Sequence, residues 1–302
     1  MISVVICTHN PRVDHLARTL DALKVQTLPC DRWELLIVDN GSLDPLQGRI
    51  DLSWHPQTGI VSEIELGVAI ARARGVREAK GEYVLFVDDD NLLHPDYLKN
   101  AEELAAKWPQ LGVWGCGSFA PEWEVEPAPH LRNHLSCLAV HTANGDRWSN
   151  LIFDYGATPP TAGMLVRTSV ARNYAEECAR SALRRGLGRK GGGLGACEDH
   201  DLAWTAVKLG YGMGIFTRLR MTHLISAGRV TETYLLRLTE GHAYSTVLLH
   251  SLWNPDLKPP KRTLVSRLRE FRYERTLDPV GVRFHRAKRA GEFRAWIELT
   301  TA

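Results

Sequence analysis

The chain has 302 residues, of which 44% are hydrophobic and 24% charged, and its formal net charge is +2. This length suits one large α/β unit with an appendage, and the apolar fraction is ordinary for a globular protein with a sizeable core. The near-balance of charge gives no support to a nucleic-acid-binding protein, and the lack of a run of about 18 apolar residues argues against a membrane-spanning helix.

Apolar runs alternate with helical patterns in the first 117 residues, which is typical of βαβ units around a mainly parallel sheet. Buried strands are predicted over residues 2–7, 33–38, 83–87 and 111–116. Helices are predicted between them over residues 16–23, 67–79 and 91–107, the last with Pro95 in its first turn. The pattern therefore predicts an α/β fold with helices flanking a central sheet.

The pattern loosens after residue 117. Three prolines and Trp123 predict an irregular insertion over 121–129, and the glycine-rich run 186–195 predicts a mobile loop. Helical spacing returns over 198–209, where Gly210 gives a stop signal, and over 230–252.

The C-terminal part differs in composition. From residue 258 to residue 294 there are twelve Lys or Arg against four Asp or Glu, a local charge of about +8 beginning at Pro259 and Pro260. We expect one domain over 1–255, with a nucleotide-binding half of about 1–117 and an acceptor half of about 118–255. A basic C-terminal extension over 256–302 is expected to follow it.

Three consecutive carboxylates, Asp88, Asp89 and Asp90, follow the predicted strand 83–87 directly. Open α/β sheets bind ligands at the carboxyl ends of their strands. Alternate residues of an extended backbone share a face, so Asp88 and Asp90 are predicted to project together and Asp89 elsewhere. Hard oxygen ligands suit Mg²⁺ or Mn²⁺. A solvated acidic turn is the alternative for the triplet taken alone.

Several segments, in the same order along the chain, resemble the family 2 glycosyltransferases, which have the GT-A fold. These segments are residues 3–10, 38–42, 67–72, 79–90, 162–167, 198–202, 222–223 and 229–231. The resemblance implies a GT-A fold with a C-terminal helical extension. It also implies inverting, metal-dependent transfer of a sugar from a nucleotide-sugar donor, with UDP favoured, to an acceptor hydroxyl, in cell-surface polysaccharide or glycolipid biosynthesis.

The resemblance implies a donor site at the first strand ends. Thr8 and Asn10 would contact the nucleotide, and Asp39 would accept the imide N–H of uracil or contact another base. Arg72 would lie near the base or the diphosphate. The family often has Arg-Asn where this chain has Arg72-Ala73, so the contact of that Asn is absent or supplied elsewhere. An Asx turn at Asp39 and a solvated Arg72 remain alternatives.

The resemblance also assigns the acidic triplet and a late histidine. Asp90 would ligate Mn²⁺ or Mg²⁺, and Asp88 would contact the ribose or the water shell of the metal. Asp89 would touch the sugar, with a structural role as its alternative. The cation would neutralise the leaving nucleoside diphosphate. His223 is a candidate metal ligand, with a structural histidine as its alternative.

Acidic residues open the predicted helix 198–209. The resemblance implies that Asp199 is the general base that deprotonates the acceptor hydroxyl, with Glu198, Asp201 and Gly163 in contact with the acceptor. The helix dipole favours carboxylates in a first turn, so helix capping alone also explains the acidic residues. The acceptor is expected to be a sugar, a lipid-linked sugar or a small molecule.

Other classes fit less well. A sugar-1-phosphate nucleotidyltransferase needs a glycine-rich loop after the first strand, which residues 8–12 lack, and a dinucleotide fingerprint at 115–120 fails because Pro121 follows it. A non-catalytic nucleotide-sugar-binding or scaffold protein of the same fold stays open. The joint presence of four acidic residues argues against it: Asp39, Asp88, Asp90 and Asp199. No processive acceptor motif is present.

Location is predicted from cysteines and charge. The six cysteines are scattered without a CxxC pair, and the first residues lack the basic region of a signal peptide, so a cytoplasmic protein is expected. The basic extension predicts possible peripheral contact with the inner membrane face through anionic lipid headgroups. No nucleic-acid partner is expected.

Overall fold

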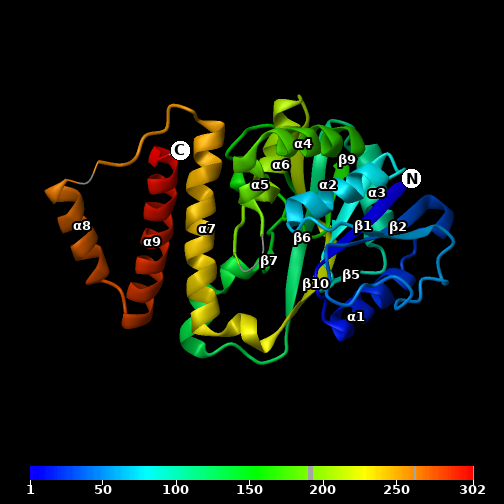
Figure 1. The fold of residues 1–302 in the computed structure, drawn as a ribbon, viewed down its shortest axis with the longest axis horizontal. Helices are drawn as coiled ribbons and strands as arrows, with labels where there is room; N and C mark the ends of the chain where they lie inside the picture. Colours follow the sequence, from blue (N-terminus) through cyan, green and yellow to red (C-terminus); the bar gives the residue numbers. More distant parts are fainter. Residues whose placement is uncertain (190–192, 262, 302) are drawn as a thin grey trace.

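A mixed sheet runs through the molecule (Figure 1). The structure is a computed structural model, and it describes residues 1–189, 193–261 and 263–301. The main path of the sheet has the order β3 (Thr58–Ser62), β2 (Trp33–Asp39), β1 (Ile2–Thr8), β4 (Tyr83–Val87), β9 (Met164–Arg167), β6 (Leu111–Trp123), β10 (Gly212–Ile225) and β5 (Asn91–Leu93). Two short strands lie off this path, β7 (His141–Thr142) beside β6 and β8 (Arg147–Ser149) beside β10.

The parallel part of the sheet aligns the strand ends that matter for the site. Strands β3, β2, β1 and β4 are parallel, and Thr8 at the end of β1 pairs with Asp39 at the end of β2. The parallel arrangement ends where β9 runs antiparallel between β4 and β6, while β6 and β10 are again parallel. The carboxyl ends of β1, β2 and β4 therefore meet at one edge.

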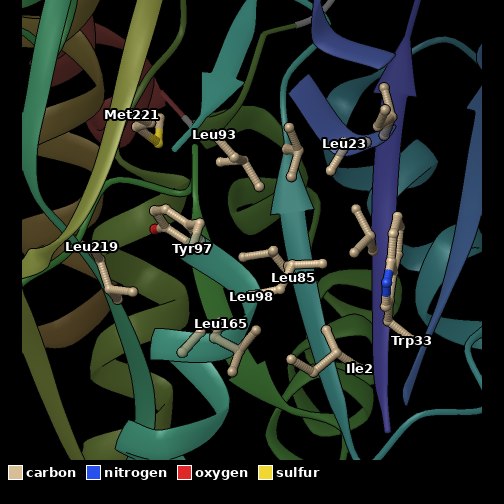
Figure 2. Close-up of a cluster of buried hydrophobic side chains, with 14 of the residues drawn as sticks. Ile2, Leu23, Trp33, Leu85, Leu93, Tyr97, Leu98, Leu165, Leu219 and Met221 are labelled. Atoms are coloured by element: carbon tan, nitrogen blue, oxygen red, sulfur yellow. The ribbon is translucent and has the colours of Figure 1, made fainter. Parts of the chain in front are cut away.

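Both faces of the central strands are buried, which explains their nearly continuous apolar sequence. Val4, Leu35 and Leu85 lie in the cluster under α1 (Val13–Lys24) and α3 (Tyr97–Lys107), part of which is drawn in Figure 2. The alternate residues of the same strands lie in a second cluster on the opposite face. That face is covered by α2 (Val68–Glu78), α4 (Thr168–Arg180), α6 (Glu198–Lys208) and α7 (Glu232–Trp253).

Two predicted elements differ from the structure. The helix predicted over 91–107 is a short strand, β5, followed by α3, because Asn91 and Leu93 pair with His223 and Met221 of β10. The predicted irregular insertion begins later than expected. Strand β6 continues to Trp123, since β10 runs parallel beside it and supplies hydrogen-bonding partners. Both differences have the same cause: strand β10, which is distant in sequence, pairs with β5 and with β6.

Short helices complete the connections. They are the 3₁₀ helices η1 (Cys30–Arg32), η2 (Pro129–Leu138), η3 (Tyr155–Ala157) and η4 (Ala227–Val230), and the helix α5 (Ala182–Leu187). Residues 186 and 187 of the predicted mobile loop belong to α5, and residues 190–192 of it lie outside the described residues. The predicted helices 198–209 and 230–252 correspond to α6 and α7.

The basic C-terminal part forms two helices beside α7. In Figure 1, α9 (Pro279–Thr301) runs along α7, and α8 (Leu264–Glu274) is the outermost helix. Ala295 of α9 is fully buried in the same cluster as Leu248 and Leu249 of α7. The extension therefore shares the hydrophobic core of the preceding domain through α9. Among the described residues, no helix has the length and apolarity needed to cross a membrane.

Candidate active site

The ends of β1 and β2 form a tightly hydrogen-bonded corner. The Asp39 carboxylate is buried, and its two oxygens accept the backbone N–H groups of Ser42 (3.1 Å) and Leu46 (2.9 Å). Burial raises the pKa of Asp39, but these hydrogen bonds outweigh burial, so its pKa lies below the usual value. Asp39 is thus an ionised turn residue with unused lone pairs for one further hydrogen-bond donor.

Asn10 connects the β1 end to the turn after β2. Its backbone has a left-handed conformation with φ of 50°, which Asn tolerates better than most residues. Its N–H donates to Ser42 Oγ (2.9 Å), and its side-chain oxygen accepts the N–H of Leu43 (2.8 Å). Asn10 is exposed, so its side chain lies where a nucleotide can reach it.

The acidic triplet does not continue the β4 strand, which ends at Val87. The three carboxylates consequently point to three different partners instead of alternating. Thr8 Oγ1 donates to Asp89, and burial is the main cause that raises the pKa of Asp89 to about 7. The expectation that Asp88 and Asp90 share one face fails, because the chain leaves the strand after Val87 and turns at Asp89 and Asp90.

Asp88 lies at one end of a polar bridge between the sheet and α6. The Arg72 guanidinium on α2 is 3.4 Å from Asp88 Oδ1 and donates to Glu198, the first residue of α6. Burial raises the pKa of Glu198, and the charge of Arg72 offsets only part of this effect. Arg72 is largely buried, so the structure does not support the alternative of a solvated side chain.

Asp90 lies in a second cluster with His223 and Arg229. Arg229 Nη1 is 2.8 Å from Asp90 Oδ2 and 2.9 Å from His223 Nε2. The buried Asn91 donates to the other Asp90 oxygen at 2.8 Å. Burial raises the pKa of Asp90, but the neighbouring His223 and the charge of Arg229 outweigh burial, so the pKa lies below its usual value.

The neighbours of His223 fix its tautomer. Its Nδ1 lies 3.1 Å from the carbonyl oxygen of Leu138, which can only accept, so Nδ1 carries the hydrogen. The Nε2 lone pair then accepts from Arg229 Nη1 at 2.9 Å, and Asp90 Oδ2 lies 3.4 Å from Nε2. An imidazole held by a backbone carbonyl is a common arrangement for metal-ligating histidines.

This arrangement fits a divalent cation. Asp90 Oδ2 and His223 Nε2 converge on one point, and the cationic nitrogen of Arg229 occupies it. No group of three or more His, Cys, Asp or Glu suited to a metal occurs among the described residues. Mg²⁺ commonly takes only one or two protein carboxylates and completes its shell with substrate phosphates and water. Asp90 and His223 are the residues that would hold such an ion.

Asp199 lies in the first turn of α6 and is paired with its neighbour. Its Oδ1 accepts the His200 backbone N–H (2.8 Å) and lies 2.7 Å from His200 Nδ1. Burial raises the pKa of Asp199, but His200 outweighs burial and brings the pKa below its usual value. The side chain keeps about a quarter of its surface exposed, at 26%. Asp199 is thus ionised and accessible.

Two other predicted acceptor residues are enclosed by protein. Asp201 has no exposed surface, and its Oδ1 binds Arg184 Nη1 (2.6 Å) and Trp253 Nε1 (2.8 Å). Gly163 is buried with φ of 75°, and a Cβ there would lie 2.7 Å from Tyr97 Oη. In the structure Asp201 is bound by side chains of the protein itself, and Gly163 is closely packed; their predicted contact with the acceptor stays a prediction.

Two residues of the site were absent from the predicted set. Arg229 lies in a segment that resembles the family, but the resemblance assigns it no role, and the sequence predicts a helix at Asn91. Arg229 follows Asp90 by 139 residues, so only the approach of η4 to the β4 end brings them together. The position of Arg229 six residues after His223 is the one sequence signal for it.

Comparisons with known proteins identify the family of the chain. The family described as "Glycosyl transferase family 2" matches residues 3–153, half of the chain. An uncharacterized glycosyltransferase of Bacillus subtilis, YwdF, is 32% identical over 158 residues, covering 52% of this chain and 50% of YwdF. The poly(ribitol-phosphate) β-N-acetylglucosaminyltransferase TarS of Staphylococcus aureus is 29% identical over 102 residues, 33% of this chain and 18% of TarS. The chain spans half or less of the length of these curated relatives.

The fold also matches solved structures. The mannosyltransferase PcManGT of Pyrobaculum calidifontis superposes with a TM-score of 0.55 at 20% identity, covering 100% of this chain and 74% of that one. At this identity the match shows the fold alone, and it confirms the predicted GT-A fold. With the family match over residues 3–153, it shows that the chain is a glycosyltransferase-fold protein that belongs to glycosyl transferase family 2.

Proposed function

We propose that the protein is an inverting, metal-dependent glycosyltransferase. It moves a sugar from a nucleotide-sugar donor, with a UDP-sugar as first choice, to an acceptor hydroxyl in cell-surface polysaccharide or glycolipid assembly. The observation that carries this proposal is the bridge from Asp88 through Arg72 to Glu198, beside Asp199. It joins the strand ends that suit a donor to the helix that carries a candidate base.

In this proposal Asp199 acts on the acceptor. Its carboxylate takes the proton of the acceptor hydroxyl as that oxygen forms a bond to the anomeric carbon. The bond from the anomeric carbon to the diphosphate breaks in the same displacement, which inverts the configuration. The low pKa that His200 gives Asp199 keeps the base ionised at neutral pH, at some cost in proton affinity.

The donor is proposed to lie at the β1, β2 and β4 ends. Thr8, Asn10 and Asp39 lie along the nucleotide, Arg72 supplies positive charge for the diphosphate, and Asp88 and Asp89 lie nearest the ribose and sugar. Asp90 and His223 would hold Mn²⁺ or Mg²⁺, which when bound neutralises charge on the leaving diphosphate. We do not include Asp201 or Gly163 in the proposed acceptor site, since Arg184 and Trp253 already bind Asp201, and Tyr97 lies close against Gly163.

One observation favours a second candidate, a nucleotide-sugar-binding protein without turnover. Arg229 already neutralises Asp90, so a donor diphosphate can meet a fixed cation here without any metal. Binding and turnover must therefore be measured separately.

A donor screen by thermal shift tests the proposal. UDP-, GDP- and dTDP-sugars are tested with and without Mn²⁺ on the wild type, Asp90→Asn and the exposed control Asp21→Asn. A donor at about 100 times its Kd stabilises the native state by roughly 2.7 kcal/mol. We expect a metal-dependent shift with one nucleotide class that Asp90→Asn loses and Asp21→Asn keeps.

Turnover is then measured with the donor that binds. Asp199→Asn should retain the thermal shift but lose release of the nucleoside diphosphate. NMR of the product made by the wild type should show inverted anomeric configuration. Binding without turnover by the wild type would favour the second candidate. No shift with any donor would overturn both.

A further inference from the structure

Helix α8 presents its polar side to the protein and its apolar side to solvent. Its half-buried residues are Ser266, Glu270 and Glu274, which are four residues apart and share one helical face. Glu270 accepts Arg289 Nε (2.7 Å) and Glu274 accepts Arg286 Nη2 (2.9 Å), both from α9. Helix α8 is thus attached to α9 by ion pairs, and none of its residues is buried.

The opposite face of α8 is apolar and exposed. Leu264, Leu268 and Phe271 follow helical spacing on one stripe, with exposed fractions of 83%, 50% and 56%, and Val265 beside them is also exposed. A helix at the surface of a soluble domain normally turns such a stripe toward the core. The orientation of α8 is the reverse of this rule, which indicates that the stripe has a partner outside the chain.

Arginines are interleaved with this apolar stripe. At about 100° per residue, Arg272 falls between Leu268 and Val265, and Arg275 falls between Leu264 and Leu268. Arg269 lies at the edge of this face and also lines the hollow between α8 and the rest of the protein. No ion pair of Arg269 or Arg272 occurs among the described residues. Both carboxylates of the helix are on the other face, engaged by α9. The exposed face therefore carries only apolar and cationic groups.

We propose that α8 binds an anionic lipid surface. Leu264, Leu268 and Phe271 enter the boundary between headgroups and acyl chains, while the arginines extend their charges to the lipid phosphates. Helix α8 is the outermost helix in Figure 1, on the side of α9 away from α7. A second copy of the chain is a poorer partner, because pairing two α8 faces would bring unpaired arginines together.

Vesicle flotation tests the proposal with the full-length protein. The probes are vesicles of phosphatidylglycerol mixed with phosphatidylcholine, and vesicles of pure phosphatidylcholine. We expect binding only to the anionic vesicles, weakened by salt. Replacing Arg269 and Arg272 by Gln should weaken binding about fivefold for each arginine removed. The triple change Leu264→Ser, Leu268→Ser and Phe271→Ser should weaken it by at least about tenfold.

Matched controls are available elsewhere on the surface. Val13→Ser with Val125→Ser removes exposed aliphatic groups far from α8 in sequence, and Arg172→Gln with Arg180→Gln removes exposed arginines from α4. Both controls should bind like the wild type, and all variants should keep its melting temperature, because the changed side chains are exposed.

Three results would overturn the proposal. They are no binding of the wild type to anionic vesicles, binding that neither α8 variant weakens, and a dimer in light scattering that the triple-serine variant dissociates. The last result would assign the face to a second copy. Since no nucleotide-sugar is present in these measurements, their failure leaves the proposed glycosyl transfer unaffected.

Discussion

Arg229 occupies the point where Asp90 and His223 converge, so it competes with any divalent cation for that point. A hydrogen bond to a charged group contributes about 1.5–3 kcal/mol, so removing it should strengthen Mn²⁺ binding by about tenfold or more. We predict this gain for Arg229→Gln, measured as bound against free Mn²⁺ by electron paramagnetic resonance, without nucleotide. Asp90→Asn should abolish binding.

Arg220→Gln is the matched control for this prediction. Arg220 lies on β10 near His223 in sequence, but its guanidinium contacts His94. Its loss should leave Mn²⁺ affinity unchanged. If Arg229→Gln binds Mn²⁺ no better than the wild type and Arg220→Gln, Arg229 is not a competitor.

His200 sets the charge state of Asp199. Burial lowers the pKa of His200, but Asp199 outweighs burial and raises the pKa above its usual value. In His200→Gln the cation is lost, so burial should raise the pKa of Asp199. We predict that the acid limb of kcat/KM moves to higher pH in this variant, measured with the donor identified by the thermal-shift screen.

The same pair predicts a pH dependence of stability. A histidine whose folded pKa is raised stabilises the protein fully below its unfolded pKa near 6.5, and this contribution is lost as pH rises through the folded pKa. The wild type should therefore lose more unfolding free energy than His200→Gln between pH 6 and pH 9, by urea denaturation. Equal losses in the two proteins would show that the pair is not coupled.

Helices α5, α6 and α7 meet at Asp201. Its Oδ1 binds Arg184 of α5 and Trp253 of α7, and its side chain has no exposed surface. Burial raises the pKa of Asp201, and Arg184 offsets only part of this effect. We predict that Asp201→Ala lowers the unfolding free energy by about 3 kcal/mol, because it leaves a buried guanidinium short of one partner.

Urea denaturation measures this change against Asp21→Ala. Asp21 is the exposed partner of Lys24, so its loss should change stability by less than about 1 kcal/mol. If Asp201→Ala is as stable as Asp21→Ala and instead raises KM for the acceptor, Asp201 contacts the acceptor as the family resemblance implied.

Elements with strong internal periodicity could be predicted from the sequence, whereas elements defined by a distant partner could not. Strand β4 was predicted over its observed residues because its buried run is apolar throughout. Strand β5 was predicted as helix, since its extended form depends on pairing with β10. The prediction that Asp88 and Asp90 share a face failed for a related reason: side chains alternate between two faces only while the backbone stays extended.

The candidate site likewise contains residues that could be predicted from the sequence and residues that could not. The strand-end residues could be predicted because the topology of a parallel sheet places strand ends together. The acidic start of α6 could be predicted because its sequence resembles a family segment. The pairing of Asp90 with Arg229 could not, since it depends on how η4 approaches β4 across 139 residues. Likewise, composition separated residues 256–302 as a basic extension but gave no sign that α9 shares the core of α7.

The attachment of α9 to α7 depends on Gly291. A Cβ at this position would lie 2.1 Å from the backbone oxygen of Glu240, so any side chain forces the two helices apart. Overpacking of this kind typically costs about 1–3 kcal/mol. We predict that Gly291→Ala lowers the unfolding free energy by this amount and speeds hydrogen exchange in α9, measured by mass spectrometry.

Gly186→Ala is the control, because Gly186 also lies in a helix but a Cβ there meets no atom within 4 Å. It should be neutral or stabilise by up to about 1 kcal/mol, since Ala loses less backbone entropy than Gly. Faster exchange confined to α8 and α9 in Gly291→Ala would show that the extension is held as one unit through α9. Unchanged exchange and stability would contradict the close helix contact, and with it the rigid support on which the lipid-facing orientation of α8 depends.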